Sequence, residues 1–410
     1  MASGSCHGRL ATRHSSLATH SASLSTPDIR PALRSHGYIL LLGFFTSFIV
    51  VLFTMPSLIK VARIKHLVDE PSEDRKVHSR SVPTIGGIII FAAILFSYSL
   101  WFPQASALAF KLEGYKSLYL EMGAAYKDFK IVIATMVLLF FIGVKDDIIG
   151  FSPVKKLMGH MIVGYILVVM GGVRISDMHG IFGIYELPNE ISIAFSFFTY
   201  VVLVNAFNLI DGVDGLAAGI GLISATAYGI WLYWAGDVAL ALLAFTLAGA
   251  LVGFLVFNYH PARIFMGDSG SLIIGAIISI LAMRVIDHDI SRLPRWLAAV
   301  PTPLFAMSVI AYPIVDTFRI FAVRIAKGQS PFAADRNHIH HRLMALGLGH
   351  RGVTLVLYLY AITIIALSLI TRDILPNKGL LVLGTTAFTL AVLPFAISPA
   401  PPAGKAPKEP

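Results

Sequence analysis

Residues 238–257 read VALALLAFTLAGALVGFLVF, an uninterrupted stretch without a charged side chain. As a helix, a segment of this length rises about 30 Å, which is the thickness of the hydrocarbon core of a bilayer. Such a stretch therefore predicts a membrane-spanning helix, because a helix of a soluble domain would carry a polar face.

Similar apolar runs recur along the whole chain. Of the 410 residues, 56% are apolar and 13% charged, whereas an ordinary soluble domain has about 25% charged residues. The sequence therefore predicts an all-α, polytopic integral membrane protein with about 11 transmembrane helices, whose loops carry any chemistry. The expected spans lie near 38–59, 83–103, 129–144, 157–172, 191–209, 216–235, 238–257, 270–286, 297–318, 352–371 and 379–397.

Both ends of the chain differ from this pattern. Residues 1–36 are rich in Ser, His and Ala and lack the apolar core of a signal peptide, so we expect a disordered tail or a mis-assigned start. Residues 38–397 form the predicted transmembrane domain, and residues 398–410 form a Pro-rich tail. The single cysteine, Cys6, excludes an internal disulfide and a cysteine-based metal cluster.

Positive charges are concentrated in alternate loops. The formal net charge of +9 is carried by short connections between apolar runs, which indicates membrane topology and not nucleic-acid binding. By the positive-inside rule, these loops face the cytoplasm and the N-terminus lies outside. The loops are 60–82, 145–156, 210–215, 258–269 and 319–351.

The same loops contain nearly all of the acidic and histidine motifs, which predicts one composite site on that face. Asp146 and Asp147 are adjacent, so ionising both beside the bilayer is costly unless a cation such as Mg²⁺ neutralises them. A solvated helix end is the structural alternative. Asp211 and Asp214 are three residues apart and therefore share one side of a helical turn.

Two further motifs also have structural alternatives. Asp268 stands where an apolar helix begins, so in isolation it favours an N-cap, although a helix start can also bind phosphate. Asp316, one turn from Arg319, is interpreted as a local ion pair. The cluster of His338, His340 and His341 suits anionic ligands better than zinc, with contact to anionic lipid headgroups as the other alternative.

The order of these motifs carries a family resemblance. Lys-Asp-Asp at 145–147 precedes Asn-x-x-Asn-x-x-Asp-Gly-x-Asp-Gly-Leu-Ala at 205–217, Phe-Met-Gly-Asp-Ser-Gly-Ser at 265–271 and Ala-Asp-Arg-Asn-His-Ile-His-His-Arg-Leu at 334–343. Over about residues 38–397 the chain resembles the polyprenyl-phosphate N-acetylhexosamine-1-phosphate transferases. The extended histidine motif is similar to that of the WecA branch and not to that of the peptidoglycan enzyme MraY.

The resemblance implies an activity and a location. Such enzymes transfer a sugar 1-phosphate from a UDP-N-acetylhexosamine to undecaprenyl phosphate and release UMP, forming the first lipid-linked sugar of a cell-envelope glycan such as lipopolysaccharide O-antigen or teichoic acid. We expect N-acetylglucosamine as the sugar. The implied location is the bacterial cytoplasmic membrane, with the active site facing the cytoplasm. Membrane lipid is a further partner, and a homodimer is left open.

The resemblance also implies roles for particular residues. Asp268, with Asp146 and Asp147, would bind Mg²⁺, for which Mn²⁺ is a potential substitute. Asp146 is the candidate base, and Asp211 would face the diphosphate. The implied catalytic residues are Asp146, Asp147, Asp211, His338, His340 and His341. The implied substrate-binding residues are Thr84, Asn208, Asp214, Asn258, Phe265, Arg336, Arg342 and Lys156.

Three alternative functions stay open from the sequence. A phospho-N-acetylmuramoyl-pentapeptide transferase would share the chemistry but require the peptidyl donor. A secondary transporter or flippase would fit the composition, but it would place ionisable residues near the bilayer midplane and often show internal repeats. A receptor-like or scaffolding protein gives no reason for the polar motifs to share one face.

Overall fold

The computed structural model describes residues 30–65, 68–69, 82–103, 115–328 and 337–397, and in these ranges the protein is almost entirely helical. The predicted C-terminal tail at 398–410 and residues 1–29 of the predicted N-terminal tail at 1–36 lie outside the described residues, whereas residues 30–36 belong to α1. The elements are α1 (Arg30–Ile64), β1 (Val68–Asp69), β2 (Val82–Pro83), α2 (Gly87–Trp101), α4 (Tyr115–Ile149), α5 (Pro153–Gly164), the π-helix η1 (Tyr165–Met170), β3 (Asp177–Ile181), β4 (Ile184–Glu186), α6 (Asn189–Leu209), α7 (Leu216–Ala235), α8 (Val238–Asn258), α9 (Asp268–Ile286), the 3₁₀-helix η2 (Ile290–Arg292), α10 (Arg295–Ala298), α11 (Thr302–Val309), α12 (Ala311–Ala326), α13 (Ile339–Ala345), α14 (His350–Ile370) and α15 (Pro376–Ala396).

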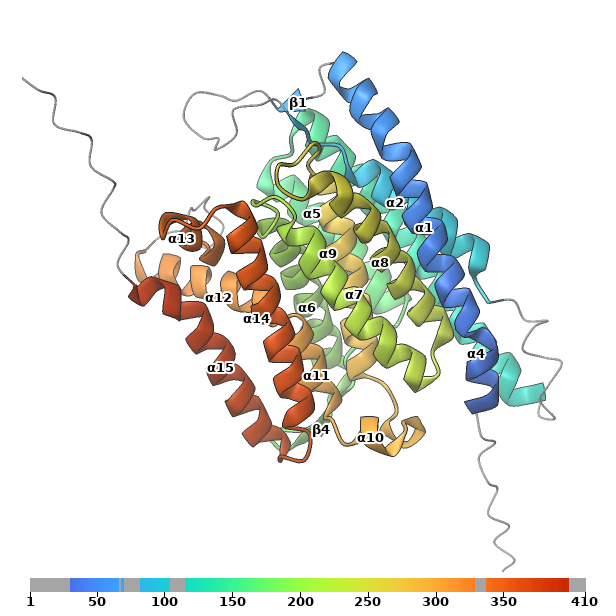
Figure 1. Cartoon of the computed structure of the whole chain (residues 1–410). Coiled ribbons are helices and arrows are strands. Elements are labelled where there is room, and N and C mark those ends of the chain that lie inside the picture. Colours follow the sequence, from blue (N-terminus) through green and yellow to red (C-terminus); the bar gives the residue numbers. More distant parts are fainter. Residues whose placement is uncertain (1–29, 66–67, 70–81, 104–114, 329–336, 398–410) are drawn as a thin grey trace, which may run out of the picture.

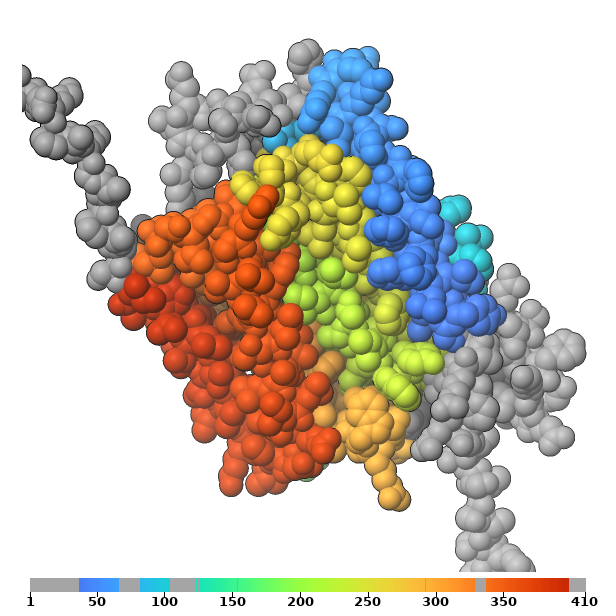
Figure 2. Space-filling model, in the orientation of Figure 1, coloured from blue at the N-terminus to red at the C-terminus, as the bar shows by residue number. Residues whose placement is uncertain are grey.

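Helix α9 forms the centre of the bundle. In the most apolar 18-residue stretch of α9, 94% of the residues are buried, whereas the share in the same kind of stretch of α15 is 22%. Helix α9 packs against α2, α4, α6, α7 and α11. Helices α14 and α15 cover one side of the molecule and α1 covers the opposite side (Figure 2). A helix that is apolar on all sides and lies inside such a ring is fully buried, and the outer helices leave apolar faces for lipid.

Among the described residues, seven helices are long and apolar enough to span a membrane, or up to eight if a bent pair is counted as one span. They account for eight of the predicted runs, so the all-α polytopic prediction is confirmed in its class. The other three runs lie in α2, in α4, and in α5 with η1. Helix α2 has only 15 residues, fewer than the roughly 20 needed to cross the hydrocarbon core without help from its neighbours.

The predicted span at 297–318 is interrupted. Helices α11 and α12 meet at an angle of 73°. Pro313 stands in the first turn of α12, where its ring removes an N–H and crowds the carbonyl four residues earlier. That carbonyl belongs to Val309, the last residue of α11. The bend therefore follows from the position of Pro313, which the apolar pattern alone did not reveal.

The polar loops gather at two ends of the bundle. Strand β1 and helix α13 lie toward one end, and β4 and α10 lie at the other (Figure 1). Strands β1 and β2 pair in one small antiparallel sheet, and β3 and β4 pair in another. Helix α1 begins at Arg30, earlier than the predicted run at 38–59.

We predict that Gly275→Ala lowers the thermal unfolding temperature of the purified protein. A Cβ at Gly275 would lie 2.7 Å from Cα of Val204 on α6, and backbone cannot move aside at the centre of the bundle. Overpacking of this kind costs about 1–3 kcal/mol. Gly384→Ala on α15 is the matched control, because no atom lies within 4 Å of a Cβ there. Equal unfolding temperatures for the two variants would contradict the close α6–α9 contact.

Candidate functional site

A pocket of about 340 Å³ opens where α4, α6 and α9 meet the segments that precede α2 and α9. The sequence predicted one composite site from loops far apart in the chain, and the structure brings residues of several of these segments together here. Six of its seven lining residues are predicted site residues, and Gly267 is the seventh. The lining consists of Thr84, Asp147, Asn208, Asp211, Phe265, Gly267 and Asp268.

Backbone pairing brings Thr84 to the pocket. The N–H of Phe265 donates to the carbonyl of Pro83 at 2.7 Å, and the N–H of Gly86 donates to the carbonyl of Phe265 at 3.0 Å. The chain then turns at Gly267, which has a φ of 72°. A Cβ at Gly267 would lie 2.1 Å from the carbonyl oxygen of Thr84. Only glycine therefore allows this close approach of the two segments.

The N-terminus of α9 is capped from another helix. The Oδ1 atom of Asp147 accepts a hydrogen bond from the N–H of Asp268 at 2.7 Å, and its Oδ2 accepts one from Ser269 at 3.0 Å. Gly267 at the N-cap position contributes no side-chain bond. The N-cap interpretation of Asp268 is therefore wrong, because the cap is supplied by Asp147 and the carboxylate of Asp268 points elsewhere. Burial raises the pKa of Asp147 despite these hydrogen bonds.

The carboxylate of Asp268 joins a network of polar groups. Its Oδ1 accepts a hydrogen bond from Nδ2 of Asn208 at 2.7 Å, and its Oδ2 contacts the ammonium of Lys156. The same ammonium lies 3.0 Å from Oδ2 of Asp146. Burial acts to lower the pKa of Lys156, but the charges of Asp268 and Asp146 outweigh it and raise the pKa. Lys156 is therefore a cation held between two carboxylates.

Asp211 faces the same group of carboxylates. Its burial, followed by the negative charges of Asp268 and Asp147, raises its pKa to about 7. An acid in this position binds a proton or a metal ion more readily than an exposed aspartate does, because either one reduces the repulsion between carboxylates.

Within the described part of the chain, four carboxylates, those of Asp146, Asp147, Asp211 and Asp268, gather around one ammonium, that of Lys156. Carboxylate oxygens are the ligands that Mg²⁺ prefers, and excess negative charge favours a divalent cation. The donor atoms therefore fit Mg²⁺. Asp268 and Asp146 are better placed as ligands than Asp147, whose two oxygens already bind the start of α9.

The predicted histidines lie beside the Asp211 loop. His340 is fully buried, and its Nε2 lies 3.1 Å from the position of a Cβ on Gly212. Its ring stacks on that of His338 with centroids 5.2 Å apart, and the ring of His341 lies 4.3 Å away. Burial, together with the charge of His341, lowers the pKa of His340 to about 3. His340 is thus a neutral imidazole at neutral pH, which can donate or accept a hydrogen bond but is not the cation that phosphate binding suggested.

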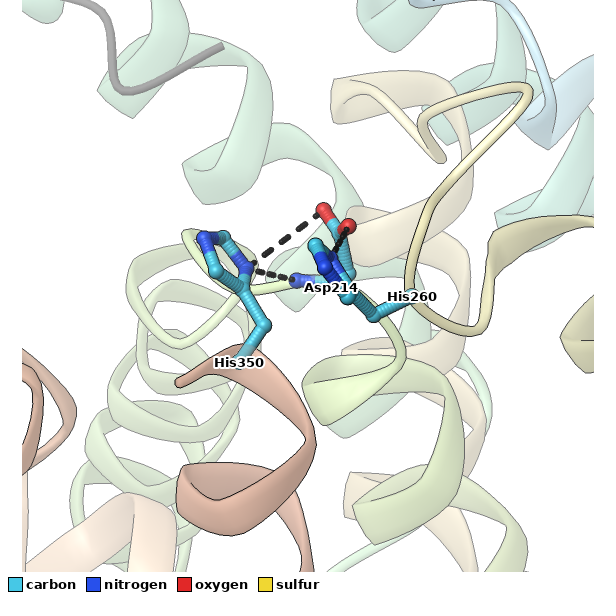
Figure 3. Close-up of side chains that lie close together, drawn as sticks. All are labelled: Asp214, His260 and His350. Carbon is cyan, nitrogen blue, oxygen red and sulfur yellow. Dashed lines mark hydrogen bonds and ion pairs between the residues drawn. The ribbon is translucent and has the colours of Figure 1, made fainter. Parts of the chain in front are cut away.

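Asp214 is buried and joins three segments (Figure 3). Its Oδ2 accepts hydrogen bonds from Nδ1 of His260 at 2.7 Å and from the N–H of Ala262 at 3.1 Å. Its Oδ1 lies 3.7 Å from Nδ1 of His350 on α14. Asp214 does not line the pocket, so its described contacts fix the loops around the site rather than face a ligand.

Asn258 has a similar position. Its Oδ1 accepts a hydrogen bond from the N–H of Gly215 at 3.0 Å, and its Nδ2 donates to the carbonyl of Ile264 at 2.9 Å. The amide is buried and ties the two loops on either side of it. Like Asp214, it is absent from the pocket lining, and its contacts are structural.

Of the two predicted arginines, Arg342 does not line the described pocket. Nε of Arg342 donates to the carbonyl of Pro394 at 3.1 Å, and a terminal nitrogen donates to the carbonyl of Ile397 at 2.6 Å. Arg342 therefore binds the C-terminal end of α15. Arg336 lies outside the described residues.

Sequence reasoning missed three residues near the site. His260 and His350 contact Asp214 from two different segments, and Asp316 contacts His338. His260 lies inside the motif at 258–271, and that position was its only signal. Asp316 carried a signal as a buried acid in an apolar helix, but its spacing to Arg319 offered a sufficient local explanation.

The fold and the pocket define a polytopic membrane protein with an acidic, oxygen-rich site at one end of its bundle. Residues 129–286 match the model of glycosyl transferase family 4. The chain is 30% identical over 344 residues to the undecaprenyl-phosphate alpha-N-acetylglucosaminyl 1-phosphate transferase of Escherichia coli O157:H7, covering 81% of this chain and 84% of that protein.

Two further relatives agree with this match. The probable undecaprenyl-phosphate N-acetylglucosaminyl 1-phosphate transferase of Bacillus subtilis (strain 168) is 32% identical, with 78% of this chain and 81% of that protein covered. The decaprenyl-phosphate N-acetylglucosaminephosphotransferase of Mycolicibacterium smegmatis is 33% identical, with 70% and 71% covered. The chain therefore belongs to glycosyl transferase family 4 and is similar to its WecA-like members.

We predict that Asp147→Asn lowers the unfolding temperature of the protein without added substrate or metal. An asparagine amide can accept a hydrogen bond through one atom only, so one N–H at the start of α9 loses its partner. Loss of such a cap costs about 0.5–2 kcal/mol. Asp373→Asn is the control, because the Asp373 side chain is 79% exposed. An unchanged unfolding temperature for Asp147→Asn would count against the cap.

We also predict a pH-dependent difference between wild type and Asp211→Asn. The folded-state pKa of Asp211 is about 7, above its unfolded value of about 3.9. The stability due to its protonated form is therefore present at low pH and is lost as pH rises through about 7. In metal-free protein, the unfolding temperature of Asp211→Asn should increase relative to that of wild type between about pH 5 and 8. A constant difference would show that Asp211 titrates normally.

Proposed function

We propose that this protein transfers N-acetylglucosamine 1-phosphate from UDP-N-acetylglucosamine to undecaprenyl phosphate. The products are UMP and a lipid diphosphate that carries the first sugar of a cell-envelope glycan. The observation that supports this proposal most directly is that one pocket is lined jointly by Thr84, Asn208, Asp211, Phe265 and Asp268. The printed names of the relatives agree in the acceptor class and in the sugar phosphate.

The reaction exchanges one phosphoanhydride bond for another. An oxygen of the lipid phosphate attacks the phosphorus next to the sugar, the bond from that phosphorus to the UMP oxygen breaks, and UMP leaves with the electron pair. A phosphate monoester is already largely ionised at neutral pH, so Asp146 as a base would remove only a residual proton. The main task of the site is to align two anions and reduce their repulsion.

Asp268 and Asp146 would hold Mg²⁺ in this proposal, with Asp211 toward the diphosphate. The ion supplies charge neutralisation of the phosphates and of the leaving UMP, and Mn²⁺ is a candidate substitute. Lys156, already between Asp146 and Asp268, can move onto a phosphate once a divalent cation replaces its charge. Asn208 keeps Asp268 oriented, and Phe265 offers an aromatic face to the uracil base.

The proposed orientation places this pocket at the cytoplasmic face of the bacterial inner membrane, with the N-terminus outside and about 11 spans. The support is the concentration of Lys and Arg in the loops that surround the pocket. A UDP-sugar is too polar to cross the bilayer. In the proposed orientation, the pocket opens to the compartment in which the donor is made.

The alternatives have less support. The chain is 30% identical to a named N-acetylglucosaminyl 1-phosphate transferase over most of both chains, which favours the small donor over the muramoyl-pentapeptide. The transporter alternative requires ionisable groups near the bilayer midplane. The carboxylates of the pocket instead come from helix ends, at Asp147 near the end of α4 and Asp268 at the start of α9.

The direct test is UMP release by the purified full-length protein in nanodiscs with undecaprenyl phosphate and MgCl₂. UDP-N-acetylglucosamine, UDP-N-acetylgalactosamine and UDP-muramoyl-pentapeptide are supplied in separate reactions. Lipid-dependent release with UDP-N-acetylglucosamine is expected, and EDTA should abolish it. Release only with the pentapeptide donor would replace the proposal by the peptidoglycan reaction. No release from folded protein with any donor would overturn the class.

We predict that Asp268→Asn lowers kcat by about 100-fold or more, because an amide is a weaker ligand for Mg²⁺ than a carboxylate. The same assay should show wild-type turnover for Asp373→Asn, the exposed control. Near-normal turnover of a folded Asp268→Asn protein would remove Asp268 from the metal site.

A further inference from the structure

Asp316 lies on α12 with its side chain only 1% exposed. Its Oδ2 accepts a hydrogen bond from Nδ1 of His338 at 2.8 Å, and its Oδ1 accepts one from the N–H of Ile339 at 2.9 Å. His338 is the N-cap residue of α13 and Ile339 is its first residue. One buried carboxylate therefore holds both the backbone start of α13 and the first histidine of the motif.

The local ion pair with Arg319 does not account for this arrangement. The nearest nitrogen of Arg319 lies 3.6 Å from Asp316, a longer separation than either contact of Asp316 with α13. Arg319 also donates a hydrogen bond to the carbonyl of Asn337. Asp316 and Arg319, which lie one turn apart on α12, thus both bind the segment 337–339.

The contact with Asp316 also determines which nitrogen of His338 carries hydrogen. A carboxylate accepts, so Nδ1 of His338 donates to it and Nε2 is left for another partner. The ring of His338 stacks on that of His340 with an interplanar angle of 10°. The orientation that Asp316 imposes on His338 therefore extends through packing to His340.

His340 is the histidine that stands next to the pocket. It is fully buried, and within the described part of the chain neither of its ring nitrogens has a hydrogen-bond partner. A buried polar group without a partner is costly, which suits a group that binds an incoming ligand. Its Nε2 lies against Gly212, the neighbour of the pocket residue Asp211.

We propose that Asp316 is a positioning residue for the sugar-phosphate transfer, fixing His338 and the start of α13 so that His340 is presented to the Asp211 side of the pocket. This inference rests on the proposed function. Asp316 itself touches no pocket residue among those described, so its effect on the reaction must pass through the histidines. In metal sites, partners that orient a ligand histidine typically contribute about 10- to 100-fold to affinity or activity.

The first experiment measures the tether without any assay of transfer. Hydrogen–deuterium exchange of the full-length protein in nanodiscs is compared between wild type and Asp316→Asn. The asparagine keeps the volume but cannot accept from both donors, so peptides covering 337–345 should exchange faster. Peptides covering α9 should be unchanged. Equal exchange at 337–345 would overturn the tether and with it the proposal.

The second experiment is a double-mutant cycle in the UMP-release assay. Asp316→Asn should lower kcat by about 10- to 100-fold with little change in KM for UDP-N-acetylglucosamine. In the His338→Ala background the same substitution should lower kcat by a clearly smaller factor, because only the contact of Asp316 with the N–H of Ile339 is left to lose. Equal losses in both backgrounds, or full activity of either single variant, would overturn the positioning role.

Asp128→Asn is the matched control. Asp128 is a part-buried aspartate paired with Arg284 at 2.5 Å, near the opposite end of α9 from Asp268. Both aspartate variants should lose thermal stability, but only Asp316→Asn should lose turnover. A wild-type protein that releases no UMP while Asp316→Asn still accelerates exchange at 337–345 would refute the proposed function and the positioning role, and leave only the tether.

Discussion

The start of α9 must satisfy its backbone N–H groups at the surface of a membrane bundle, and this constraint organises the site. Among the described candidate spans this helix has the largest buried share, and its first turn must therefore meet partners within the bundle. Asp147 solves the problem by accepting from both Asp268 and Ser269. Because the positive end of the helix dipole meets this carboxylate, α4 and α9 are fixed together where the chemistry is expected.

The contact between these two helices brings several negative charges close together, and their repulsion is unfavourable. Asp147 brings Asp146 with it, and Asp268 is brought close to both. Lys156 offsets part of the resulting negative charge by binding Asp146 and Asp268. The remaining charge raises the pKa of Asp211 to about 7. Carboxylates in such an arrangement are the ligands that Mg²⁺ prefers, and this is why the proposed function includes a divalent cation.

Glycine allows the close packing that this arrangement needs. A Cβ at Gly143 would lie 2.4 Å from Cα of Ser269, and one at Gly87 would lie 2.1 Å from the N of Gly270. Helices α4 and α2 therefore reach the backbone of α9 directly, as small residues permit in membrane bundles. Around this rigid centre, Asp214 and Asp316 tie the outer segments to the pocket, one through His260 and the other through His338.

The sequence alone determined the class of protein and most of the pocket. Uncharged runs of about 20 residues can be stable in a bilayer only as helices. The motifs in alternate loops predicted one composite site, and the family resemblance implied that Thr84, Asn208, Asp211, Phe265 and Asp268 belong to it. The sequence could not separate ligand-facing groups from structural ones, because both are polar residues in the same motifs. Only the tertiary structure showed that Asp147 caps α9, that Asp214 and Asn258 join loops, and that Asp316 holds His338. These roles depend on hydrogen bonds between residues as many as 136 positions apart, whose geometry is set by helix packing and leaves no periodic signal in the chain.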